Sequence, residues 1–295
     1  MRISAKVDIA INVYGKPFQT ALAIRSLIKY SGDHVGRIFI KLEKKQPFGF
    51  DENQLRDLLK DLDVVYYKPS LFLGWWQIQK RNWVNKLLFK IPMFRFSIRY
   101  QYPWEKTEAN YLFLSHNDMV FHGDILSNYL SKIEDNIAIG HVGQCWNCPA
   151  HKIHCDGDRY WDYRPTMDEL SNLYENWPVN RAVIWGLIQP GKASWPLPEC
   201  RLNEHGALIN MQIARKLTAP KGSFSPIGLM TMDIGIKWFQ DAANAGYKVV
   251  HDSFFKYAKH GMFNEAGSGH GALFDESLYN KEESLAKEML ESNSF

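Results

Sequence analysis

The sequence predicts an α/β protein built on a doubly wound, mostly parallel sheet. Within residues 1–70, short apolar runs alternate three times with segments whose apolar residues recur at helical spacing. A later apolar run, 111–114, stops abruptly at a polar group, 115–118. Ligands of such sheets bind beyond the carboxyl ends of the strands, so the same observations predict where the functional site lies.

The elements follow one another in a regular order. The first apolar run ends at the turn residues Gly15, Lys16 and Pro17 and leads into a helix, and Gly36 precedes the second run. Gly246 caps the last predicted helix before a short strand. The predicted strands are 7–13, 37–42, 64–67, 111–114, 136–142 and 247–250. The predicted helices are 18–28, 53–62, 124–133, 207–211 and 239–245.

The pattern divides the chain into three parts. Residues 1–142 carry the alternation and form the predicted ligand-binding half. Residues 143–222 are rich in Trp, Pro, Cys, His and Arg with weak periodicity, which predicts an inserted, loop-rich region. Residues 223–295 are expected to complete the same domain, because 295 residues fit one large domain with an insertion.

Composition excludes several classes of protein. Hydrophobic residues make up 45% and charged residues 23%, which is typical of a globular chain. A net charge of +3 is too small to predict a nucleic-acid partner. No window has the roughly eighteen apolar residues of a membrane span, and the amino terminus lacks the layout of a signal peptide. We therefore expect a cytoplasmic protein whose cysteines are reduced.

A basic, aromatic segment lies between Asp63 and Glu105, where the sequence has no acidic residue. Its cations are Lys68, Lys80, Arg81, Lys86, Lys90, Arg95 and Arg99. Clustered positive charge beside apolar rings suits a peripheral contact with the inner membrane surface or a phosphorylated acceptor. A half-buried helix with a solvated basic face is the alternative.

The polar group after the strand at 111–114 is a candidate metal site. A carboxylate and an imidazole at a strand end can hold Mn²⁺ or Mg²⁺. The segment resembles the Asp-x-Asp element of GT-A glycosyltransferases, with His116 in place of the first acid. The resemblance implies that His116 and Asp118 bind the metal, that His116 and Asn117 contact a nucleotide-sugar, and that Asp118 takes part in catalysis.

The chain also resembles family 2-like, nucleotide-sugar-dependent glycosyltransferases in its opening strand and helix. The resemblance implies donor contacts with the nucleoside at Asn12 and Tyr14, with its base at Glu43, and with the phosphates at Arg99. It makes residues 1–142 the nucleotide-sugar-binding half and the inserted region the acceptor side.

The similarity covers about residues 5–142 and, more loosely, 225–262. It implies transfer of a hexose from a UDP- or GDP-linked donor to a saccharide or lipid-linked acceptor, as in polysaccharide biosynthesis. Two other readings stay open. One is a nucleotidyltransferase on a similar fold, and the other is a non-catalytic, zinc-stabilised module that binds carbohydrate or protein.

Two more residues are candidates for this chemistry. Many GT-A enzymes supply a metal-facing histidine after the last strand, which implies His260 here rather than His251. A structural hydrogen bond is the alternative for either histidine. An inverting transferase needs a general base, and Glu204 is the candidate. Its alternative is a first-turn acid in the helix at 207–211, capped by Asn203.

The four cysteines form a separate candidate site. Cys145 and Cys148 have the two-residue gap of a zinc knuckle, and Cys155 and Cys200 follow without repeating it. A structural Zn²⁺ that ties the inserted region together is one interpretation of the four. Ordinary buried cysteines are the other.

Overall fold

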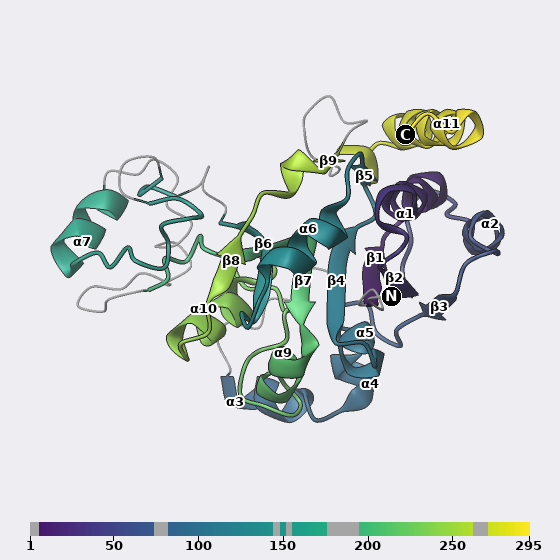
Figure 1. The fold of residues 1–295 in the computed structure, drawn as a ribbon. Coiled ribbons are helices and arrows are strands. Elements are labelled where there is room, and N and C mark those ends of the chain that lie inside the picture. The colour runs from purple at the N-terminus through teal and green to yellow at the C-terminus, as the bar shows by residue number, and fades with distance from the viewer. Residues whose placement is uncertain (1–5, 74–81, 144–147, 152–154, 176–194, 262–270) are drawn as a thin grey trace.

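The computed structural model describes residues 6–73, 82–143, 148–151, 155–175, 195–261 and 271–295. Seven strands of the described chain form one central sheet in the order β3-β2-β1-β4-β7-β6-β8 (Figure 1). These strands are β1 (Val7–Val13), β2 (Val35–Leu42), β3 (Val64–Tyr67), β4 (Tyr111–His116), β6 (Ala138–Val142), β7 (Leu202–Asn210) and β8 (Val249–His251). A small second sheet pairs β5 (Met119–Phe121) with β9 (Ala258–His260).

The central sheet confirms the predicted α/β class. Its neighbouring strands are parallel except around β7, which runs antiparallel to both β4 and β6. From β1 the chain moves outward to β2 and β3, and then returns to place β4 on the other side of β1. The strand order therefore reverses between β1 and β4, which is where open α/β sheets bind ligands.

Helices cover both faces of the sheet. The helices are α1 (Pro17–Ser31), α2 (Glu52–Leu58), α3 (Asn82–Leu88), α4 (Pro92–Arg95), α5 (Gln101–Lys106), α6 (Ile125–Lys132), α7 (Met167–Glu175), α9 (Met211–Leu217), α10 (Ile236–Asn244) and α11 (Glu276–Ser292), with 3-10 turns η2 (Phe254–Lys256) and η3 (Gly271–Leu273). None of the described helices is both long and apolar enough to cross a bilayer.

The two faces of β1 and β4 belong to two cores. Ile9 and Phe113 pack in a cluster with residues of α1, α2 and α6. Ala10 and Leu112 lie in the opposite cluster, with residues of α5, α9 and α10. Successive strand residues point to opposite faces, so burial on both sides explains why these strands are continuous apolar runs in the sequence.

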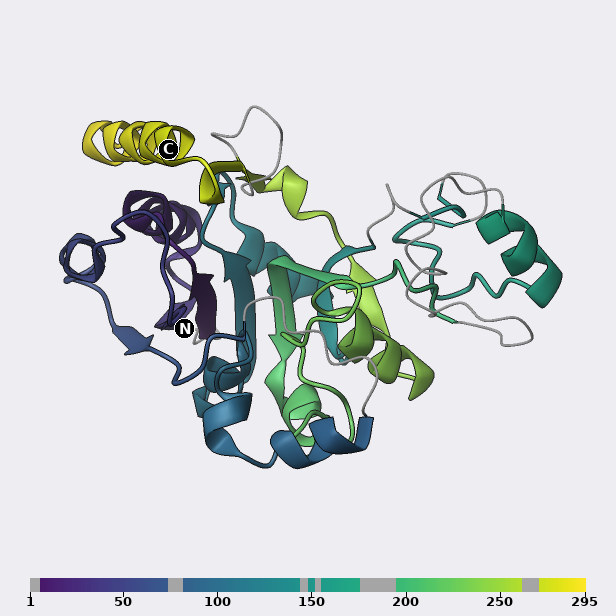
Figure 2. The same cartoon turned by 180° about the vertical axis from the view of Figure 1, so that it is seen from behind.

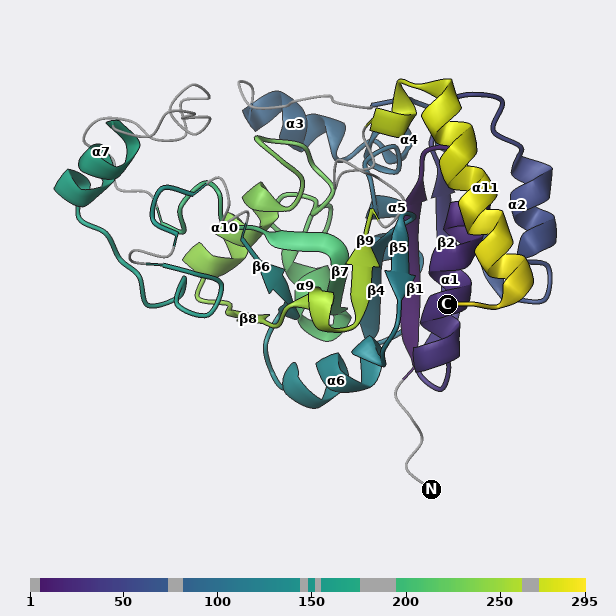
Figure 3. The same cartoon turned by 90° about the horizontal axis from the view of Figure 1, so that it is seen from above.

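The C-terminal helix α11 packs across α1 and completes its first turn (Figure 3). The N-cap residue Lys16 has φ 61° and offers no side-chain cap. Glu283 of α11 supplies one instead, because its carboxylate accepts hydrogen bonds from the backbone N–H groups of Phe18 (2.9 Å) and Gln19 (3.0 Å). A helix start leaves these donors without partners inside the helix, so α11 stabilises the turn that follows β1.

The range 143–222 has two structurally different parts. Its helix α7 stands apart from the central sheet (Figures 1 and 2). Its later residues instead form β7, in the middle of the sheet. The helix predicted at 207–211 was therefore wrong over 207–210, and α9 begins only at Met211. A strand buried on both faces has no polar alternation, so periodicity alone does not separate it from a short buried helix.

Candidate functional site

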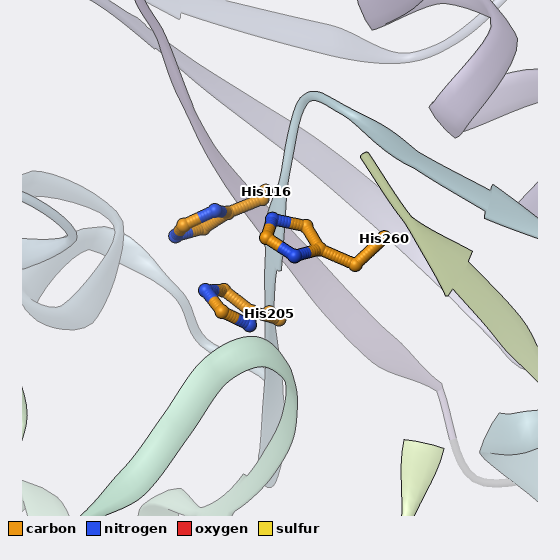
Figure 4. Close-up of side chains that lie close together, drawn as sticks. All are labelled: His116, His205 and His260. Atoms are coloured by element: carbon orange, nitrogen blue, oxygen red, sulfur yellow. The ribbon is translucent and has the colours of Figure 1, made fainter. Parts of the chain in front are cut away.

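Three histidines from three strands meet where β4 ends (Figure 4). His116 ends β4, His205 lies on β7, and His260 ends β9. The ring centroid of His205 is 4.1 Å from that of His116 and 4.0 Å from that of His260. One nitrogen from each ring lies within 4.8 Å of the other two. Three converging imidazoles form a ligand set that suits a first-row transition metal.

Strand pairing explains how these histidines come together. Ser115 of β4 pairs with Gly206 of β7. Because the two strands are antiparallel, His116, which follows Ser115, lies beside His205, which precedes Gly206. The ladder between β5 and β9 then brings His260 back to the turn that follows β4. The cluster therefore depends on the antiparallel insertion of β7 into the sheet.

Asp118 lies on that turn and faces two of the imidazoles. Its Oδ1 atom is 3.3 Å from Nε2 of His260 and 3.7 Å from Nδ1 of His116. Neither contact has the geometry of a hydrogen bond, and this buried oxygen has no hydrogen-bond partner in the described part of the chain. Burial alone would raise the pKa of Asp118, but the adjacent imidazoles hold it well below the usual range. An ionised, unsatisfied oxygen at this place fits a bound cation.

Glu204 links His116 to Arg201. Its Oε1 accepts a hydrogen bond from Nε2 of His116 at 3.1 Å, and its Oε2 accepts one from Nη1 of Arg201 at 2.9 Å. Burial would raise the pKa of Glu204, but Arg201 and His116 keep it well below its ordinary value. Burial would likewise lower the pKa of His116, but Asp118 and Glu204 raise it to about 9. A metal ion bound here would take the place of the His116 proton.

A second polar cluster adjoins the first on β1 and β2. Nζ of the buried Lys41 donates to Oδ1 of Asn12 (3.2 Å) and to Oε1 of Glu43 (2.9 Å). Nε of Arg99 lies 4.0 Å from the same Glu43 oxygen. The other oxygen, Oε2, is buried and has no hydrogen-bond partner among the described residues. Asn12 pairs in register with His116, so the two clusters form one row along the carboxyl ends of the parallel strands.

Two other predicted residues are Asn117, which follows β4 and contacts the start of α1, and Tyr14, which lies between β1 and α1. Nδ2 of Asn117 donates to the carbonyl of Gly15 (3.2 Å) and to Oγ1 of Thr20 (3.1 Å). Tyr14 stacks on Phe72 with ring centroids 6.2 Å apart. Asn117 thus ties the end of β4 to the first turn of α1.

The structure brings most of the predicted site residues together at one edge. They are His116, Asp118, Glu204 and His260 in one group, and Asn12, Glu43 and Arg99 in the adjoining one. Sequence reasoning missed His205, Arg201 and Lys41. A signal existed for each, because Arg201 and His205 flank Glu204, and Lys41 interrupts an apolar strand two residues before Glu43, on the same face.

The cysteines lie elsewhere. Cys148, Cys155 and Cys200 are buried and line a cavity of about 10 Å³ together with His151. Cys145 lies outside the described residues. Within the described ranges, the group close enough to hold a metal ion is the three-histidine cluster. The zinc site therefore stays a prediction.

No family model and no curated protein matches this chain. Among solved structures, it is similar to a mannosyltransferase from Pyrobaculum calidifontis in complex with GDP-Man and Mn²⁺, with 11% identity and a TM-score of 0.46 over 85% of this chain. The chain spans 56% of the length of that mannosyltransferase. It is also similar to the galactosyltransferase LgtC, with 11% identity and a TM-score of 0.41, covering 84% of this chain and 74% of LgtC. For S. aureus TarS the identity is 9% and the TM-score 0.43, covering 86% of this chain and 59% of TarS.

Proposed function

We propose that the chain is a metal-assisted glycosyltransferase of the GT-A type, which transfers a sugar from a nucleotide-sugar donor. The observation that carries the proposal is the convergence of His116, His205, His260 and the unsatisfied oxygen of Asp118 at the end of β4. The strand order reverses at this place, and nucleotides bind at such reversals in open α/β sheets.

The ligand set favours one kind of cation. His116, His205, His260 and Asp118 would hold it, and the ion would neutralise charge on the departing diphosphate. Mg²⁺ takes oxygen ligands almost throughout, whereas first-row transition metals accept imidazole and carboxylate together. We therefore favour Mn²⁺ or a similar transition-metal ion over Mg²⁺.

Glu204 fits a positioning role better than the general-base role expected from sequence. A general base works best with a pKa near the working pH, whereas the pKa of Glu204 is depressed and both its oxygens already accept hydrogen bonds. Held by Arg201, Glu204 instead fixes the ring of His116 through Nε2. Acids that orient a metal-binding imidazole in this way increase its basicity and metal affinity.

The adjoining cluster fits the nucleoside end of a donor. Oε2 of Glu43 is a buried acceptor without a partner in the described chain, which suits the ring N–H of a uracil or guanine base. Arg99 is partly exposed beside Glu43 and offers a guanidinium to the phosphates. A UDP- or GDP-linked sugar would supply both groups.

The acceptor side is proposed to include the aromatic residues of the inserted region. The guanidinium of Arg164 lies 3.4 Å from the ring centroid of Trp195, and Trp161 packs against the same ring at 5.4 Å. Such flat, amphipathic faces suit stacking on a saccharide or on the sugar of a lipid-linked acceptor.

The test is thermal unfolding of the purified protein with UDP, GDP and nucleotide-sugars, each with Mn²⁺, with Mg²⁺ and without metal. A ligand that binds the native state raises the midpoint. We expect one nucleotide series to raise it with Mn²⁺, and Asp118→Ala to abolish that shift. His122→Ala, at an exposed histidine outside the site, should keep it.

The same experiment separates the alternatives. A midpoint raised by Mn²⁺ alone, with no response to any nucleotide, would leave a metal site but remove the transferase. A response to nucleoside triphosphates and sugar phosphates would point to a nucleotidyltransferase. Release of nucleoside diphosphate from the stabilising nucleotide-sugar, lost in Asp118→Ala, would then establish donor turnover.

A further inference from the structure

The segment of α3 and α4 exposes apolar side chains that are not part of the core. Leu87 is 54% exposed, Ile91 45% and Met93 52%. The same segment buries Phe89 and Phe94 in a small cluster against the body of the molecule. The two sets therefore face different ways, and the exposed set contributes nothing to that cluster.

A tight backbone connection keeps these exposed residues close together along the chain. Between the two helices the chain keeps turning, with the N–H of Ile91 donating to the carbonyl of Leu88 at 2.9 Å and that of Arg95 to Ile91 at 3.0 Å. α3 ends at Leu88, and Ile91 is the N-cap of α4 with an extended backbone (φ −88°, ψ 112°), so the exposed residues lie on one short segment from the last turn of α3 to the first turn of α4. Both helices form the lower rim of the molecule in the front and back views (Figures 1 and 2).

The charges carried by this segment are positive. Lys86 and Lys90 are exposed and, like Leu87 and Ile91, four residues apart. The sequence has no acid between Asp63 and Glu105, and Glu105 is itself paired with Arg95 at 2.8 Å. The exposed apolar side chains therefore lie beside lysines with no nearby acid in the sequence.

We propose that the surface of Lys86, Leu87, Lys90, Ile91 and Met93 docks on an anionic phospholipid bilayer. The apolar side chains would enter the boundary between headgroups and acyl chains, and the lysines would contact headgroup phosphates. A protein partner fits less well, because lysine is depleted from protein interfaces. A second copy of the chain would also bring the lysines of both copies together.

Docking also bears on the acceptor. Arg99 follows α4 closely and contacts Glu43, so this segment connects the membrane surface to the candidate site. A lipid-linked acceptor would meet the site at the bilayer. That last step rests on the proposed function, whereas docking itself does not.

The test is sedimentation of the full chain with vesicles of phosphatidylcholine, alone or with about one third phosphatidylglycerol. We expect binding to the anionic vesicles only. Each lysine near an anionic surface contributes to the free energy of binding. The double variant Lys86→Gln with Lys90→Gln should therefore bind about 30-fold more weakly. Leu87→Ser with Met93→Ser should also lose binding. The matched control is Phe274→Ser, at an apolar residue 79% exposed on another part of the surface, and it should bind like the wild type.

Several results would overturn docking. One is a wild type that ignores anionic vesicles, and another is equal loss in the Phe274 control. A third is a wild-type protein that is dimeric and binds no vesicles, and whose dimer dissociates in the variant Leu87→Ser with Met93→Ser. That result would make the surface a contact between two copies of the chain. The nucleotide-dependent melting shift of the same variants is read separately. Because the substituted residues are exposed, this shift should stay at the wild-type value, so failure of docking is distinguishable from failure of the proposed function.

Discussion

Glu204 connects two positively charged side chains of the candidate site, His116 and Arg201. It is 2% exposed and accepts hydrogen bonds from His116 on one side and Arg201 on the other. Arg201 also lies 3.4 Å from Oδ1 of Asp233, which does not contact His116 among the described interactions. The two acids therefore share Arg201 but differ in their relation to the imidazole of His116.

That difference gives a matched pair of substitutions. We expect Glu204→Gln to weaken Mn²⁺ binding by about 10- to 100-fold, because an imidazole that loses its orienting acid loses metal affinity. Asp233→Asn should bind Mn²⁺ nearly as the wild type does. Isothermal titration with Mn²⁺, without nucleotide, measures both. Equal losses in the two variants would mean that Arg201, and not the orientation of His116, controls the affinity.

The residues of the site were predictable to different degrees. His116 and Asp118 follow an apolar strand abruptly, and that local signal was sufficient to select them. His205 was missed because its segment was interpreted as the approach to a helix. Its contact with His116 depends on β7 pairing with β4 across ninety or so residues of chain, and no local pattern encodes such a pairing.

At the scale of elements, α11 serves as a cap for α1. Glu283 is buried against the N–H groups of Phe18 and Gln19. Burial raises its pKa to about 7; the two N–H groups and Lys16 oppose the shift, and Glu282 adds to it. The folded protein therefore binds a proton at Glu283 more tightly than the unfolded chain, in which the pKa is near 4.5.

This shift predicts a pH dependence of stability. The contribution of protonated Glu283 is fully present below about pH 4.5 and is lost as the pH rises through about 7, on the order of 3 kcal/mol in total. The free energy of unfolding of the wild type should therefore fall as the pH rises through this range. Glu283→Gln should remove this dependence, so that its free energy of unfolding increases relative to that of the wild type between about pH 5 and about pH 8. Urea unfolding across the pH series measures the difference. Glu288→Gln, at an exposed acid of the same helix, is the control, and a slope that survives in Glu283→Gln would assign it to another group.

Most elements of the sheet were predictable because their signals are local. Apolar runs bounded by Gly, Pro or polar clusters marked β1 to β4. Asp51 is the N-cap of α2, and Asp124 is the N-cap of α6. The failure at β7 has a physical cause. Both faces of that strand are buried, and its Glu204 and His205 are polar because they belong to the site rather than to a surface. The cap that α11 supplies to α1 was equally hidden, since its partners are far apart in sequence.

At the scale of the whole molecule, the candidate site combines residues from the middle of the chain with residues nearer both ends. β1 supplies Asn12, and Glu43 directly follows β2, while β9 supplies His260 and α11 holds the turn after β1. A buried ion pair between Lys16 and Glu282 fastens the two ends, with Lys16 3% and Glu282 1% exposed. Taking two charges out of water is costly, and each charge becomes a larger cost if the other is removed.

The ion pair can therefore be tested by removing one charge and then both. Lys16→Met should lower the free energy of unfolding by about 3–5 kcal/mol, because it leaves the Glu282 carboxylate buried without its partner. Adding Glu282→Leu should restore most of the loss, since a well-packed apolar pair can replace a buried ion pair at little cost. Lys287→Met breaks an exposed pair with Glu291 on the same helix and should cost less than about 1 kcal/mol.

Urea unfolding with an unchanged slope measures all three variants on one scale. Recovery in the double variant would mean that the charges themselves are dispensable and that packing of α11 on α1 holds the ends together. A double variant as unstable as Lys16→Met would instead mean that Glu282 stabilises the fold in a second way, apart from its pairing with Lys16. Its other oxygen, Oε1, is buried without a hydrogen-bond partner among the described residues. In either case a change in Mn²⁺ affinity that accompanied the loss of stability would indicate that the ion pair and the histidine cluster are energetically coupled.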